Sequence, residues 1–310
     1  MDQGHRTAVA AAIAVAAMVA ASSAPAGPRA APASLDGVWT NFSATPLERP
    51  AEFKALTTTA AGAAAYIAVD HKPVDPVGGT DSEWYTAAGG LSRVDGQLRT
   101  SIITTPADGK LPWSDEGRRR IEAGLKNRIT KFDDPETRPG PERCLISGWG
   151  ANSVPMFPSP DNGGYRFVQT KDALAIWIES GREPRIIRLD AKQHLPGFMR
   201  PWMGDSIGHW VGRTLVVETT NFNAGESFKS PLPIYISPDA RVTERFTRVS
   251  KDEIRYAFRV EDPAAFSTPW EGEEVFRTQP QRLFDFACHE GNYAEAGILG
   301  GARAAERVGK

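Results

Sequence analysis

The chain of 310 residues carries 36 basic and 38 acidic side chains, interspersed along its length, and has a formal net charge of −2. A nucleic-acid-binding protein favours a basic stripe, so this charge pattern argues against a nucleic-acid partner. Eight Trp and fourteen Phe are enough for a large core or an aromatic-lined cavity.

The N-terminus has the pattern of a secretory signal. An apolar run from Thr7 to Ala21 precedes Ala24-Pro25-Ala26, the small-residue pattern that a signal peptidase recognises. The run is shorter than the roughly 20 residues of a membrane-spanning helix, and no later segment is apolar enough to span a membrane. We therefore predict a signal peptide over residues 1–26, a flexible spacer over 27–34 and one β-rich domain over 35–310, in a periplasmic or secreted protein.

Helical patterns lie in the N-terminal portion of this domain. The Ala-rich stretch from Thr57 to Val69 predicts a weak helix, and Leu98 to Thr104 has strand character. The clearest helix runs from Ser114 to Ile129, because Ser114 can cap it and acidic residues follow in its first turn. Lys131 to Glu142 is rich in proline and charge, which predicts a solvated loop.

From Tyr165 onward the pattern changes to short strands. The last long one, Glu253–Glu261, alternates apolar and charged residues with period 2, which is typical of a strand with one buried face. Gly212-Arg213 predicts a two-residue hairpin turn of type II′. The predicted strands are 165–170, 173–179, 185–189, 210–211, 214–218, 241–249, 253–261, 273–278 and 283–287. The fold class is therefore mainly β, an antiparallel meander that closes into a lipocalin-like barrel or packs as a sandwich.

Cys144 and Cys288 are the only cysteines. In an oxidising compartment a lone pair usually forms a disulfide, and two buried free thiols are the alternative. Cys288-His289-Glu290 is a poor metal site because adjacent side chains seldom turn toward one ion. The chain has neither C-x-x-C nor H-E-x-x-H. We predict no metal site and no cofactor.

Gly204-Asp205-Ser206-Ile207-Gly208 matches G-x-S-x-G, the nucleophile elbow of α/β-hydrolases. That elbow needs a strand followed by a helix, whereas the next residues predict a hairpin, so a Gly-flanked turn is favoured. Asp205 and His209 are the first catalytic candidates, as a carboxylate–imidazole pair for acid–base chemistry. The alternative is a turn Asp and an unrelated His at a strand start.

Two loops hold the other candidates. His194 lies in a Pro-bounded loop with Arg200 and Trp202, and loops at a barrel mouth often build binding sites. The segment Cys288–Tyr293 is rich in polar groups, in which His289 or Glu290 could donate or accept a proton. In the alternative interpretation, these groups form hydrogen bonds with the backbone of a C-terminal loop beside a disulfide. Trp210 and Tyr293 are further candidates for ligand contact.

Two glutamates lie in predicted strands. Glu244 shares the parity of Val242 and Phe246, so an inward face would bury its carboxylate, which then needs a partner, either among the neighbours of Arg245 or an Arg from another strand. Glu218 points either into a cavity or into solvent. A buried charge pair is more often structural than catalytic.

Gly37-Val38-Trp39 resembles the G-x-W of lipocalin-like barrels, in which the Trp lies on the first strand and plugs the closed end. Longer motifs are similar to a large, poorly characterised family of exported bacterial proteins. They are 47–50, 142–144, 204–206 with 209–217, 219–222, 244–249 and Ala287-Cys288-His289-Glu290-Gly291-Asn292-Tyr293. The resemblance implies export and supplies no catalytic residue. At Arg213 the chain departs from the family, where an acidic residue is expected.

These observations leave two main hypotheses. The first is an exported barrel that binds or carries an apolar or aromatic small molecule. The second is an enzyme on the same scaffold, a cofactor-independent lyase, isomerase or hydrolase. It would use His209 with Asp205, or His289 with Glu290, as acid and base, and Arg200 to hold an anionic group. No specific feature favours a structural protein of the envelope.

Overall fold

The computed structural model describes Met1 and residues 34–70, 90–140, 142–145, 154–158, 163–179, 181, 183–224, 228–229, 234–279, 283–284, 287–290 and 292–309. Apart from Met1 and Ser34, the predicted signal peptide (1–26) and spacer (27–34) lie outside these residues. In the described part of the chain, no helix is long and apolar enough to cross a membrane.

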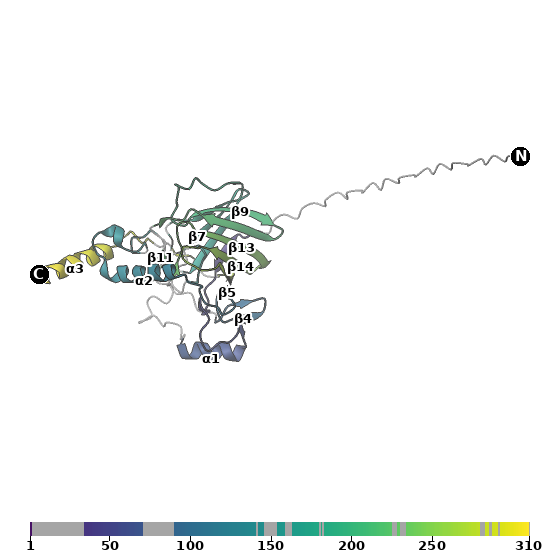
Figure 1. The fold of residues 1–310 in the computed structure, drawn as a ribbon, viewed down its shortest axis with the longest axis horizontal. Helices are drawn as coiled ribbons and strands as arrows, with labels where there is room; N and C mark the ends of the chain where they lie inside the picture. Colours follow the sequence, from purple (N-terminus) through teal and green to yellow (C-terminus); the bar gives the residue numbers. More distant parts are fainter. Residues whose placement is uncertain are drawn as a thin grey trace. The chain divides into compact units, whose positions relative to one another are not determined.

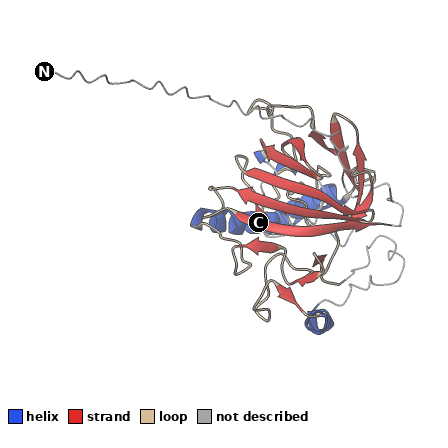
Figure 2. Ribbon diagram, turned by 90° about the vertical axis from the view of Figure 1, so that its right-hand side faces the viewer, coloured by secondary structure: helices blue, strands red, loops and turns tan. Residues whose placement is uncertain are grey.

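Nine of the described strands close a β-barrel, which confirms the predicted fold class (Figures 1 and 2). The ring closes because β1 pairs with β15 at one side and with β6 at the other. The nine strands, in order around the ring, are β1 (Gly37–Thr40), β6 (Gly164–Gln169), β7 (Ala173–Ile178), β8 (Arg185–Arg188), β9 (Asp205–Val211), β10 (Thr214–Thr220), β13 (Arg241–Ser250), β14 (Glu253–Glu261) and β15 (Trp270–Thr278).

One strand pair departs from the predicted antiparallel meander. β8 and β9 are parallel, with Ile187 opposite Ser206 and Arg188 opposite Ile207, whereas the other pairs of the ring are antiparallel. A parallel pair needs a long connection that returns the chain to the end where it started. Residues 189–204 make this crossover and carry His194, Arg200 and Trp202.

The remaining described elements flank the barrel. β2 (Thr57–Thr58), β4 (Gln97–Arg99) and β3 (Arg93–Val94) form a small sheet beside helix α1 (Ala60–Asp70), and β5 (Ile103–Thr105) pairs with β15. Helix α2 (Asp115–Thr130) begins as predicted, because the Ser114 hydroxyl accepts a hydrogen bond from the Gly117 N–H at 2.9 Å. η2 (Pro135–Thr137), β11 (Phe228–Lys229), β12 (Ile234–Tyr235) and α3 (Ala294–Val308) complete the set.

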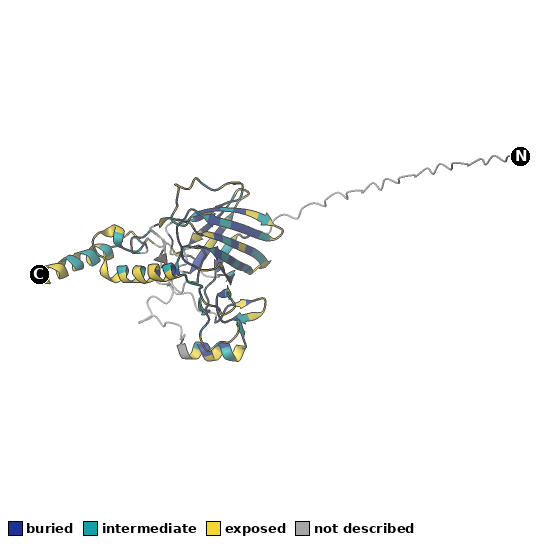
Figure 3. Ribbon diagram, viewed as in Figure 1, coloured by how far each residue is buried: buried dark blue, intermediate teal, exposed yellow. Residues whose placement is uncertain are grey.

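Two predictions about the C-terminal region are wrong. Leu283, Phe284 and Ala287 lie outside any strand, although 283–287 was expected to form one. Helix α3 was not predicted, and none of its side chains is buried (Figure 3).

Many residues of the barrel strands are buried (dark blue in Figure 3), and most of the largest fully buried side chains are aromatic. Phe167, Phe246, Tyr256 and Phe276 are fully buried and pack ring against ring with centroids 5.0–6.5 Å apart. The short segment 154–158 enters this core, where the Met156 N–H donates to the Tyr256 hydroxyl at 3.0 Å. The aromatic content thus builds a packed core in the described part of the barrel.

Trp39 explains the G-x-W pattern. It is fully buried on β1, its indole N–H donates to the Leu35 carbonyl at 3.0 Å, and the Arg248 guanidinium lies 4.6 Å from its ring centroid. A Cβ at Gly37 would lie 2.9 Å from the indole, so the ring requires glycine two residues before it. Gly37 and Trp39 are therefore one packing unit.

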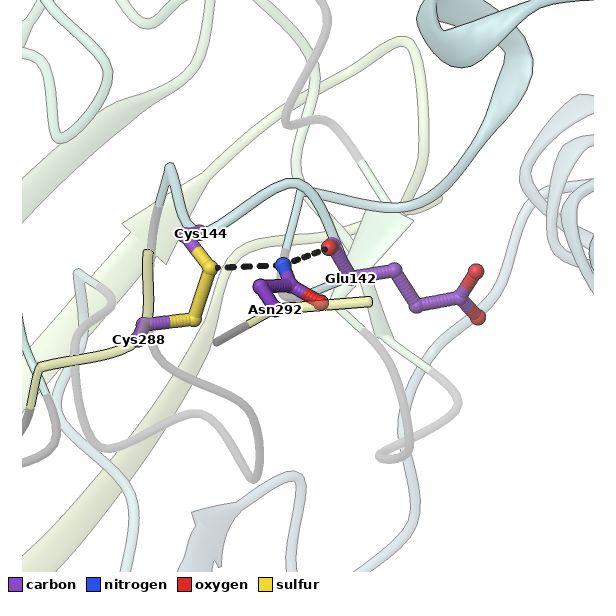
Figure 4. The surroundings of a disulfide bond; sticks show 4 residues. All are labelled: Glu142, Cys144, Cys288 and Asn292. Carbon is purple, nitrogen blue, oxygen red and sulfur yellow. Dashed lines mark hydrogen bonds between the residues drawn. A yellow bond between two sulfur atoms is a disulfide. The ribbon is translucent and has the colours of Figure 1, made fainter. Parts of the chain in front are cut away.

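The predicted disulfide is confirmed. Cys144 and Cys288 are bonded, with Cα atoms 5.7 Å apart and a separation of 144 positions in sequence (Figure 4). The Asn292 side-chain amide donates to the Glu142 carbonyl at 3.3 Å and lies 3.1 Å from the Cys144 sulfur. The bond ties the segment after η2 to the segment that leads into α3.

Candidate functional site

A pocket of about 270 Å³ lies where β8 and β9 begin to run side by side. Its wall combines half-buried apolar side chains of the crossover, Leu195, Trp202 and Met203, with the polar side chains of Arg185 and Arg188. The full lining is Glu183, Pro184, Arg185, Ile186, Arg188, Leu195, Pro201, Trp202, Met203, Gly204, Asp205 and Ser206. The volume is just below the usual range for ligand pockets, so the site suits a small molecule.

Arg185 projects from the pocket wall into the barrel and is 2% exposed. Its Nη1 donates to Glu244 at 2.9 Å and its Nη2 donates to the other Glu244 oxygen. Nε and Nη2 also donate to Ser206 at 3.2 and 3.1 Å, and Nη2 donates to Thr219 at 3.0 Å. All three nitrogens of this guanidinium are therefore occupied.

The expectation for Glu244 is confirmed, because it is fully buried and its partner is an arginine from another strand. The Tyr256 hydroxyl donates to the same carboxylate at 2.8 Å. Burial by itself would lower the pKa of Arg185, but the Glu244 carboxylate outweighs it and raises that pKa. The Arg185 guanidinium thus stays charged, and the pair with its hydrogen-bond partners joins β8, β9, β10, β13 and β14 from inside the barrel.

Ser206 is not a nucleophile in an elbow. It lies within strand β9, is 2% exposed, and hydrogen-bonds Thr219 at 2.9 Å as well as Arg185. The glycines of the motif serve packing: Gly204 adopts a φ of +75°, and a Cβ at Gly208 would lie 3.0 Å from Ile187. The predicted Gly-flanked turn is also wrong, because Asp205–Val211 is a strand.

A second polar network lies on the outer face of the same strands. Asp205 accepts two hydrogen bonds from Nη2 of Arg188, at 2.9 and 3.0 Å, and one from the Leu195 N–H at 2.8 Å. His194 Nδ1 lies 2.8 Å from Asp205, and its Nε2 lies 3.1 Å from Glu218. Arg241 in turn pairs with Glu218. This network fastens the crossover to β8, β9 and β10.

Asp205 remains charged within this network. Burial by itself raises the pKa of its carboxyl. Hydrogen bonds with the Leu195 N–H, His194 and Arg188 together lower that pKa by more than burial raises it, so the resulting pKa lies below its usual value. Asp205 is 5% exposed, so the charge depends on these partners.

The predicted Asp205–His209 pair does not form. Both residues lie on strand β9 and face outward, four positions apart, which separates them by about 13 Å at roughly 3.3 Å per residue. His209 is exposed, and Asp205 pairs with His194 instead. Residues four apart can meet in a turn, whereas the extended strand β9 already begins at Asp205.

Arg200 holds the crossover in shape rather than lining the pocket. Its Nε donates to the Gly197 carbonyl at 3.1 Å, and its Nη1 donates to the carbonyls of Phe222 and Pro238 at 3.3 and 2.6 Å. Its Nη2 pairs with Asp239 at 2.8 Å. The role of anion holder expected for Arg200 is therefore poorly supported.

The other candidates are dispersed. Trp202 lines the pocket, whereas Trp210 packs against the main core. His289, Glu290 and Tyr293 are exposed beside the disulfide and do not line this pocket. The candidate acids and bases of the two regions thus do not share a site.

The sequence pattern did not single out Arg188, although the alternation along β8, from Arg185 to Arg188, places one arginine on each face of the strand.

Among the described residues, no group of three His, Cys, Asp or Glu side chains could hold a metal ion. Comparisons with protein-family models, curated proteins and solved structures find no match. The function is therefore inferred from the geometry of the chain itself.

Proposed function

We propose that this barrel protein binds a small apolar or aromatic molecule in the pocket between β8 and β9. The observation that carries the proposal is the wall itself, in which Trp202, Met203 and Leu195 lie opposite hydrogen-bonding groups fixed by ion pairs. Ligand pockets generally combine an apolar lining with a few well-placed polar groups. Arg185 and Asp205 fix the two strands that form the wall.

Binding is better supported than acid–base catalysis at this pocket. Both ring nitrogens of His194 face carboxylates, and His194 is not among the pocket-lining residues. His209 points away on the outer face, and Arg185 has no free nitrogen. The charged groups near the pocket are therefore used to build the wall.

Export and membership of the exported bacterial family belong to the same proposal. The sequence of residues 1–26 supports a signal peptide, and the Cys144–Cys288 bond is compatible with an extracellular location. A protein of this kind would meet its ligand outside the cytoplasm. The mass of the N-terminal peptide of the exported protein tests cleavage after Ala26.

Substitution of Trp202 tests the binding proposal. A panel of phenolic and terpenoid compounds is titrated into the purified protein, with binding followed by calorimetry and products by mass spectrometry. For compounds that bind, Trp202→Ala should weaken affinity about 10-fold or more, because a well-packed aromatic anchor contributes on the order of 2 kcal/mol.

Trp177→Ala is the matched control. Trp177 is 42% exposed on β7 and does not line the pocket, so its loss should leave affinity unchanged. Equal affinities of wild type and Trp202→Ala for every ligand would exclude this pocket as the binding site. A new product formed by the wild type would favour the enzyme hypothesis instead.

A further inference from the structure

Arg188 is a pocket-lining cation with unused donors. Nη2 donates to both oxygens of Asp205 and, at 3.3 Å, to the carbonyl of Gln193. Its Nε and Nη1 have no hydrogen-bond partner among the residues that the structure describes, so three N–H groups are available. The side chain is 33% exposed, which leaves it within reach of a ligand.

The neighbouring arginines lack this freedom. Arg185 has bonds on all three nitrogens and is neutralised by the buried Glu244. Arg200 likewise has bonds on all three nitrogens, mostly to backbone carbonyls. Of these three guanidinium groups, only that of Arg188 combines a place in the pocket wall with free N–H groups.

The position of Arg188 is fixed before any ligand arrives. Asp205 anchors Nη2, and Asp205 is itself held by the Leu195 N–H and by His194. The Asp205 oxygens are thus already engaged by Leu195 and His194 as well as by Nη2, whereas Nε and Nη1 of Arg188 are not engaged by Asp205. Glu183 is also in the wall, but it is exposed and its charge is screened by solvent. A held guanidinium suits an anionic oxygen, because charge-assisted hydrogen bonds are the strong ones.

We propose that the pocket selects small molecules that carry a carboxylate on an aromatic or apolar body. The carboxylate accepts hydrogen bonds from the free N–H groups of Arg188, and the apolar body packs against Trp202. This inference rests on the proposed binding function and adds the chemical class of the ligand. It moves the anion-holding role from Arg200 to Arg188.

Matched acid and amide pairs test the selection. Benzoate is compared with benzamide, and phenylacetate with phenylacetamide, by calorimetry at neutral pH. The wild type should bind each acid about 10-fold or more tightly than its amide, as expected for a hydrogen bond to a charged group. Arg188→Gln should abolish this preference by weakening only the acid, and Arg188→Lys should keep part of it. Arg213→Gln, which removes an exposed arginine in the β9–β10 turn, should change nothing.

The outcomes separate the inference from the function on which it rests. If acids and amides bind the wild type equally, the inference is wrong and the binding proposal stands. If Arg188→Gln weakens acid and amide alike, Arg188 is a structural residue and the inference is also wrong. If these compounds and every neutral compound of the phenolic and terpenoid panel fail to bind, the proposed function itself fails.

Discussion

Glu244 and Glu274 are two fully buried carboxyl groups in one barrel, and their surroundings are opposite. Glu244 accepts hydrogen bonds from both Nη atoms of Arg185 and from the Tyr256 hydroxyl. Neither oxygen of Glu274 has a hydrogen-bond partner among the described residues. Tyr256 lies beside both, because its ladder partner on β15 is Glu274.

The difference shows what decides the charge of a carboxyl inside this barrel. Burial raises the pKa of Glu274 to about 8, because no hydrogen bond within normal distance offsets the loss of solvent. Glu274 is therefore mostly protonated at neutral pH. Glu244 lies equally deep, but both of its oxygens accept hydrogen bonds from the Arg185 guanidinium. A directly bonded cation, rather than depth, separates the two sites.

The same substitution at both positions should give the largest contrast. Glu244→Leu leaves Arg185 as a buried charge without its partner, so the free energy of unfolding should fall by about 3 to 5 kcal/mol. Glu274→Leu removes an unsatisfied polar group, so stability at pH 7 should be unchanged or higher. Urea unfolding of both variants measures the difference.

A double variant controls for packing. Arg185→Met combined with Glu244→Leu replaces the pair by apolar side chains and should recover most of the lost stability. Equal losses for Glu244→Leu and Glu274→Leu would show that shape, not charge pairing, governs both sites.

The pH dependence of stability sharpens the comparison. Because the pKa of Glu274 is raised from 4.5 to about 8 in the folded protein, the native state keeps a proton that the unfolded state loses. Its stabilising contribution is complete below about pH 4.5 and is lost as pH rises toward 8, at about 1.4 kcal/mol per pH unit.

Glu274→Gln removes this proton linkage. Between pH 6 and 8 the free energy of unfolding of the wild type should fall by about 2 to 3 kcal/mol relative to the variant. Urea unfolding at several pH values in this window provides the measurement. Parallel curves for the two proteins would mean that Glu274 does not carry the proton.

The local sequence pattern was sufficient to predict the strands of the barrel and which side chains point into its core. The alternation of Glu253–Glu261 is borne out in β14, and the parity of Glu244 correctly implied a buried carboxylate with an arginine partner. The pairing of Cys144 with Cys288 followed from their number and the export signal. The choice of Arg185 could not be predicted, because it depends on closure of the ring, which brings β8 opposite β13.

The pocket was harder to predict because it depends on the parallel pairing of β8 with β9. That pairing makes residues 189–204 a crossover and brings His194 to Asp205, eleven positions along the chain. Proximity in sequence suggested His209 as the partner of Asp205. In an extended strand, however, residues four apart are too far from each other to form a hydrogen bond. Long-range strand order leaves no signature in local periodicity.

Substitution of Tyr256 should give the smallest change in stability, because Tyr256 bonds Glu244 and is only the register partner of Glu274 on the neighbouring strand. Tyr256→Phe removes one of the hydrogen bonds to Glu244 and the acceptor of the Met156 N–H, while the ring is kept. The free energy of unfolding should fall by about 1 to 2 kcal/mol in urea. The slope of stability against pH between 6 and 8 should stay as in the wild type, because no bond joins Tyr256 to Glu274. A flattened slope would show that the two carboxyl groups are coupled through the tyrosine and are not independent sites.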